Sequence, residues 1–133
     1  MEKLYFESSA LTPLIEFDAQ VGEMTIKGRS IPDNPDEFWY PVLRWFENYA
    51  LSPASQTVFN INLEYFNVTS SKRILALLYK LNELVDRDMH VKVNWFYRDG
   101  DEDMFEVGQD YAYMVKVPFE FHVMSENDLA IAI

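Results

Sequence analysis

The fold is decided by the segment Thr57-Val58-Phe59-Asn60-Ile61-Asn62-Leu63-Glu64-Tyr65-Phe66-Asn67-Val68-Thr69-Ser70-Ser71-Lys72-Arg73. Its first ten residues alternate between apolar and polar side chains, which predicts a half-buried strand with Phe59, Ile61, Leu63 and Tyr65 on one face and Val58 and Phe66 on the other. From about Ser71 to Arg87 the apolar side chains recur at spacings of three and four, which predicts an amphipathic helix. The strand therefore passes into the helix through a very short junction.

The same alternation of strand and helix continues on both sides of this segment. Before it, residues 14–18 and 24–27 predict a hairpin that ends at Gly28, and Asn34 followed by Pro35 predicts the start of a helix. Ser52-Pro53 should stop that helix, which contains Pro41 and can be kinked or delayed there. After the segment, residues 91–97 predict a strand, residues 101–114 a helix and residues 118–123 a last strand.

This order predicts an α/β protein with a mixed sheet of about five strands, three helices and an N-terminal hairpin. Strand–helix–strand units imply right-handed crossovers and a parallel arrangement in that part of the sheet. The order resembles the STAS-type architecture of bacterial anti-sigma-factor antagonists. The 133 residues are expected to form one domain, with residues 1–12 as an N-terminal arm or edge strand and residues 124–133 as a tail or an added strand.

Composition excludes several classes of function. Eleven lysines and arginines against 22 acidic residues give a net charge of −11, which disfavours nucleic acid and anionic membranes as partners. The chain has no cysteine, which excludes disulfides and thiolate chemistry. No signal peptide or membrane-spanning segment is evident, so a cytoplasmic protein is expected. No glycine-rich phosphate loop, catalytic-triad signature or metal motif appears, so we expect neither an enzyme nor a cofactor or metal site.

The strand–helix junction is the strongest candidate site. Thr69, Ser70 and Ser71 follow one another there, and one of them is expected to cap the helix, although a cap needs only one hydroxyl. Lys72 and Arg73 lie in the expected first turn, where the positive end of the helix dipole makes cations unfavourable. Both cations become favourable if a phosphate lies beside them, so the pattern indicates a phosphoacceptor at residue 69, 70 or 71.

Four sequence marks together resemble the SiaC family of bacterial regulatory phosphoproteins, over about residues 4–123. These marks are Thr12-Pro13, Gly28-Arg29-Ser30-Ile31-Pro32, Leu63-Glu64-Tyr65-Phe66-Asn67 with the following hydroxyls and Lys72, and Asn94-Trp95-Phe96-Tyr97 before Asp101-Glu102-Asp103-Met104. The resemblance implies a non-enzymatic partner switch. It implies a serine/threonine kinase that phosphorylates the junction, a PP2C-type phosphatase that reverses this, and a diguanylate cyclase that the unmodified form binds and activates. Cyclic di-GMP would then favour aggregation or biofilm growth.

The sequence departs from this family at one position that matters. The family pattern Tyr-x-Asn-Thr-Ser-Ser-x-Lys places its acceptor threonine on Val68, which cannot be phosphorylated. The acceptor is therefore expected at Thr69, with Ser70 or Ser71 as the lesser options, unless the switch has been lost. Tyr65, Asn67, Val68 and the exposed side of the following helix are expected to form the partner surface.

Two other functions remain open at this point. An anti-sigma-factor antagonist would share the fold and the switch but bind an anti-sigma kinase. A small-molecule-binding domain would use a pocket among the many aromatic residues, which make up 16% of the chain.

Overall fold

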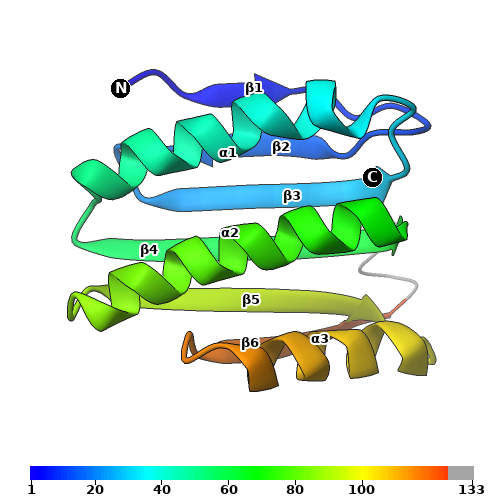
Figure 1. Ribbon diagram of the computed structural model, residues 1–133. Coiled ribbons are helices and arrows are strands. Elements are labelled where there is room, and N and C mark those ends of the chain that lie inside the picture. Colours follow the sequence, from blue (N-terminus) through cyan, green and yellow to red (C-terminus); the bar gives the residue numbers. More distant parts are fainter. Residues whose placement is uncertain (126–133) are drawn as a thin grey trace.

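The computed structural model describes residues 1–125, and all its strands form one six-stranded sheet. Figure 1 shows three helices lying on the same face of that sheet. The strands are β1 (Leu4–Phe6), β2 (Leu14–Asp18), β3 (Glu23–Ser30), β4 (Gln56–Phe66), β5 (His90–Arg98) and β6 (Phe119–Met124). The helices are α1 (Pro35–Leu51), α2 (Val68–Asp86) and α3 (Glu102–Met114).

The sheet follows the chain in order from β1 to β6. Strands β1, β2 and β3 pair antiparallel, and β3, β4, β5 and β6 pair parallel, which confirms the predicted mixed sheet with its hairpin. The sheet has six strands where about five were predicted, because residues 4–6, in the expected arm or edge strand, form the edge strand β1. The possible tail at 124–133 lies outside the described residues except for Met124, which ends β6, and Ser125.

The core lies between the helices and the sheet face that they cover. Its largest fully buried side chains are Trp39, Trp95, Tyr49, Phe17, Phe46 and Phe59. Helix α1 remains continuous through Pro41, and Asn34 caps it by accepting a hydrogen bond from the backbone N–H of Glu37. The start predicted at Asn34-Pro35 is therefore confirmed. No helix within residues 1–125 is both long and apolar enough to cross a membrane.

The predicted end of the hairpin at Gly28 is wrong, because β3 continues to Ser30. Gly28 has a φ of +121°, a conformation that glycine adopts without steric cost. The pairing with β4 shifts there, since Gly28 lies opposite Leu63 whereas Arg29 lies opposite Tyr65. Glu64 is thus the extra residue of a β-bulge.

The bulge also overturns the predicted face of Tyr65. An extra residue reverses the alternation of side chains beyond it. Phe66 consequently points toward the core, where its ring centroid lies 6.5 Å from that of Trp95, and Tyr65 is 50% exposed. The sequence alternation predicts the reverse, with Tyr65 on the face of Phe59 and Phe66 on the other face.

Helix α2 begins at Val68, three residues earlier than predicted, and its cap is not a hydroxyl residue. Asn67 caps it, because the Asn67 Oδ1 atom accepts a hydrogen bond of 2.9 Å from the Ser70 backbone N–H. Asparagine is at least as good a capping residue as serine or threonine. As a result, Lys72 and Arg73 lie in the second turn rather than the first, where the dipole acts less strongly.

We predict that Gly108→Ala destabilises the protein by about 1–3 kcal/mol through overpacking. A Cβ atom at Gly108 would lie 2.5 Å from Nε1 of the buried Trp95, whose N–H donates to the Met104 carbonyl. This clash outweighs the gain in helix propensity of about 1 kcal/mol. Urea unfolding measures the effect, with Gln109→Ala, on an exposed neighbour, as a control expected within about 0.5 kcal/mol of wild type. A stabilised Gly108→Ala variant would show that this contact is not tight.

We predict that Asn67→Ala lowers the free energy of unfolding by about 1 kcal/mol, because the Ser70 N–H loses its acceptor. Asn67→Asp, which keeps an acceptor oxygen, should remain close to wild type. Denaturant unfolding of both variants provides the measurement. Equal stability of Asn67→Ala and wild type would rule out this cap as the element that fixes the start of α2.

Candidate functional site

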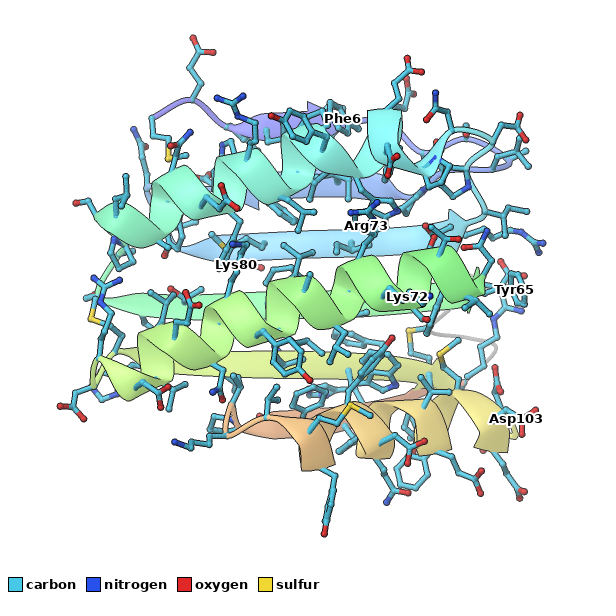
Figure 2. All side chains as sticks on the ribbon, in the orientation of Figure 1. Phe6, Tyr65, Lys72, Arg73, Lys80 and Asp103 are labelled. Carbon is cyan, nitrogen blue, oxygen red and sulfur yellow. The ribbon has the colours of Figure 1, made fainter. Side chains whose placement is uncertain are left out.

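The candidate site lies at the edge of the sheet where β3, β4 and β5 end and the helices begin (Figure 1). In a parallel sheet with helical crossovers, the carboxyl ends of the strands and the helix N-termini meet at one edge, which is where binding sites commonly form. The junction of β4 with α2 occupies the middle of this edge. Figure 2 shows Tyr65 and Lys72 there, with Arg73 between α1 and α2.

The three hydroxyl residues of the junction have different environments. Ser70 is fully buried, and its Oγ atom lies 2.7 Å from Ser30 Oγ and donates to the Ser30 carbonyl at 3.1 Å. The Ser71 hydroxyl is half-buried and donates to the Val68 carbonyl at 2.6 Å. Thr69 is exposed, and within residues 1–125 its hydroxyl has no hydrogen-bond partner. The turn therefore presents one free hydroxyl to solvent.

Two apolar side chains of the predicted partner surface are exposed beside Thr69. Val68 is 71% exposed and Tyr65 is 50% exposed. The Arg29 guanidinium lies over the Tyr65 ring, 5.7 Å from its centroid, and also lies 3.9 Å from the Glu64 carboxylate. Sequence analysis did not identify Arg29 as part of the junction, because only the bulge brings it opposite Tyr65. Asn67, the third predicted residue, uses its side chain as the cap.

The two cations expected to neighbour a phosphate have different partners. Arg73 forms an ion pair with Asp36 in the first turn of α1, which connects the N-terminal ends of the two helices. Lys72 is exposed, and no carboxylate of the described chain pairs with it. On a helix surface, residues three and four positions apart are neighbours, so both cations lie on the helix surface next to Thr69.

Helix α3 is fastened to the same turn by a tyrosine that sequence analysis missed. The Tyr111 hydroxyl donates a hydrogen bond of 2.9 Å to the Ser71 carbonyl. Burial raises the pKa of Tyr111 to about 12, although the hydrogen bond to Ser71 opposes this shift. Its phenol is therefore protonated at neutral pH and available as a donor. Forty positions separate the two residues, so no local sequence signal reveals this contact.

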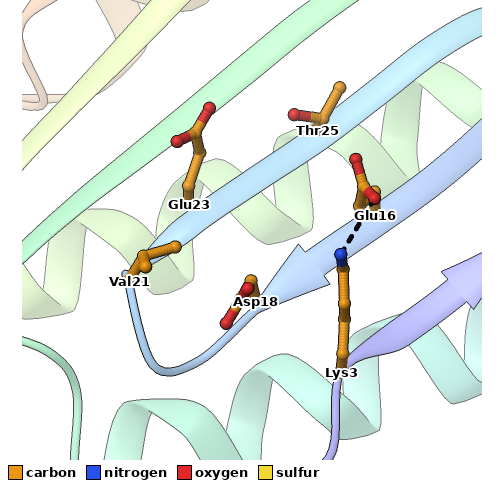
Figure 3. Close-up of a pocket in the computed structure, with 6 residues that line it drawn as sticks. All are labelled: Lys3, Glu16, Asp18, Val21, Glu23 and Thr25. Carbon is orange, nitrogen blue, oxygen red and sulfur yellow. Dashed lines mark ion pairs between the residues drawn. The ribbon is translucent and has the colours of Figure 1, made fainter.

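A separate acidic hollow lies at the opposite end of β3 (Figure 3). It has a volume of about 170 Å³ and is lined by Lys3, Glu16, Asp18, Val21, Glu23 and Thr25. Lys3 lies 3.0 Å from Glu16, whose hydrogen bond and charge raise the pKa of the Lys3 ammonium group. No group of three or more histidine or carboxylate side chains within residues 1–125 is arranged to hold a metal ion.

Known proteins resemble this chain over nearly its whole length. An uncharacterized protein of Pseudomonas aeruginosa strain UCBPP-PA14 is 25% identical over 126 residues, covering 95% of this chain and 100% of that protein. The crystal structure of apo-SiaC from Pseudomonas aeruginosa has a TM-score of 0.84 at 24% identity, covering 92% of this chain and 99% of SiaC.

A second solved structure contains a partner. It is the complex of the diguanylate cyclase SiaD with its activator SiaC from Pseudomonas aeruginosa, in which a matching chain has a TM-score of 0.87 at 25% identity. The match covers 91% of this chain and 99% of that one. The model of the SiaC family of regulatory phosphoproteins matches residues 6–124. Because the family model covers most of its length, this chain belongs to the SiaC family of regulatory phosphoproteins.

Proposed function

We propose that this protein is the phosphorylation-controlled binding component of a cytoplasmic partner switch, and that Thr69 is its phosphoacceptor. In its unmodified form it binds and activates a diguanylate cyclase, so that cyclic di-GMP rises and favours aggregation or biofilm growth. A serine/threonine kinase adds the phosphate and a PP2C-type phosphatase removes it. The protein acts through binding and performs no catalytic step itself. Membership of the family and the SiaC–SiaD complex support the cyclase as the partner class.

The observation that carries this proposal is the free hydroxyl of Thr69. A kinase needs a hydroxyl that it can reach and that is not already held by the protein. Ser70 fails on both counts because it is buried and hydrogen-bonded to Ser30, and the Ser71 hydroxyl donates within its own turn. Thr69 is exposed and its hydroxyl is free among the described residues, although the family threonine would fall on Val68.

The environment of Thr69 explains how a phosphate could control docking. Exposed Val68 and Tyr65 offer apolar contact area at the junction, and a docked partner would remove this area from water. A phosphothreonine at residue 69 carries about −1.5 to −2 charges, and its desolvation opposes docking. The dianion would instead be satisfied by water, by Lys72, and by the N–H groups at the start of α2.

The effect of this phosphate must be local. The protein already carries a net charge of −11, so one dianion changes its long-range field only slightly. Exposed charges also act over only about 10 Å at ordinary ionic strength. Control of docking by Thr69 therefore requires the partner to cover the junction itself.

We expect incubation with the cognate kinase to place phosphate on Thr69. Peptide mapping by mass spectrometry should find the modification there, and Thr69→Ala should abolish it. Ser71→Ala provides the matched control, because it removes a neighbouring hydroxyl and should leave the modification intact. Phosphate found only on residues other than Thr69, Ser70 and Ser71 included, would refute the assignment.

We expect Thr69→Glu to impair activation of a diguanylate cyclase from the same organism. The concentration needed for half-maximal activation should rise about tenfold or more, which corresponds to about 1.4 kcal/mol. The glutamine of Thr69→Gln is nearly the same size as glutamate but carries no charge, so this variant should activate almost as well as wild type. Cyclic di-GMP production at increasing protein concentration provides the measurement. Equal loss in both variants would indicate a steric effect and contradict the electrostatic mechanism.

A further inference from the structure

A second exposed groove lies beside the N-terminal end of α1. It has a volume of about 410 Å³, within the range of about 300–1,000 Å³ typical of ligand sites. The end of β1, the loop before α1 and the first turn of α1 form it. We call it the α1 groove, and its main lining residues are Phe6, Pro32 and Phe38, which are apolar, and Glu7, Asp33 and Glu37, which are acidic.

The apolar part of the α1 groove consists mainly of two phenylalanine rings. The centroids of Phe6 and Phe38 lie 5.9 Å apart with the rings tilted by 55°. The Phe38 ring also packs edge-on against the ring of Trp39, with 5.1 Å between the centroids. Trp39 is fully buried. The two rings therefore form a supported but only partly buried surface that an apolar side chain can cover.

The acidic part of the groove lacks any cation of its own. Within residues 1–125, none of Glu7, Asp33 and Glu37 forms an ion pair, although Glu37 accepts a hydrogen bond from the Asn34 side chain. A helix N-terminus normally favours an anion, but Asp36 and Glu37 already occupy the first turn of α1. The complement of this groove is therefore a positively charged group.

We propose that the α1 groove is a docking site for a basic segment of a partner protein, with lysine or arginine beside one or two aromatic or aliphatic side chains. The apolar side chains would cover Phe6 and Phe38, and the cations would meet Glu7, Asp33 and Glu37. A second copy of this chain fits poorly, since most of its lysines and arginines are already ion-paired within residues 1–125. The groove lies outside the junction, so this proposal does not depend on phosphorylation of Thr69.

A fluorescein-labelled synthetic peptide in which lysines flank phenylalanine and leucine tests this proposal by fluorescence anisotropy. Replacing the acidic rim in Glu7→Gln/Asp33→Asn/Glu37→Gln should weaken binding about tenfold or more, or about 1.4 kcal/mol. The matched control Glu83→Gln/Glu106→Gln/Asp110→Asn changes the net charge equally at exposed positions of α2 and α3. Because exposed charges are screened beyond about 10 Å, the control should bind within about twofold of wild type.

Two further variants separate the possible outcomes. Phe6→Thr keeps a residue suited to a strand and should also weaken the peptide, whereas Thr69→Ala should bind it as wild type does. Amide chemical shifts should change at residues 6–7, 33–34 and 36–38. Equal weakening by the rim and control variants would overturn the proposal in favour of a general charge effect. A peptide with glutamate in place of lysine that binds equally well, or self-association through the groove, would also overturn it.

Discussion

The start of α2 is fixed by a few hydrogen bonds that connect it to β3. Asn67 contributes one of them, since its backbone N–H donates to the Ser30 carbonyl at 3.1 Å, and its side chain caps the helix by accepting from the Ser70 N–H. The buried pair of Ser30 and Ser70 hydroxyls adds a second connection to β3. A buried hydroxyl without a partner is costly, so these contacts hold the turn in one register. The exposure of Thr69 follows from that register rather than from any property of threonine.

Much of the fold could be predicted from periodicity, but not the details that position the junction. The alternation in residues 57–63 correctly predicts the core face of β4. It fails at Tyr65 because the bulge at Glu64 depends on how β4 pairs with β3. The local sequence of β4 does not reveal this pairing. The start predicted for α2, at about Ser71, is three residues too late for a related reason. Asn67 and the hydroxyl residues after it are all good caps, and the contact with Ser30 selects among them.

The candidate site, like the fold, could be predicted from the sequence only in part. A run of hydroxyls followed by cations was sufficient to locate the junction and to restrict the proposed acceptor to residues 69–71. It was not sufficient to show that Arg73 pairs with Asp36 or that Tyr111 reaches the Ser71 carbonyl, because both contacts join different helices. These contacts attach α1 and α3 to the turn that carries Thr69. In the proposed switch, they would hold the backbone of this turn while a phosphate changes its surface charge.

The central claim is that a phosphate on Thr69 decides whether a diguanylate cyclase can dock. The most direct test is isothermal titration calorimetry of one cyclase with the unmodified protein and with protein fully phosphorylated on Thr69. The proposal predicts that the phosphate raises Kd about tenfold or more, a loss of about 1.4 kcal/mol, and that phosphatase treatment restores the original value. Equal Kd values for the two forms would contradict it.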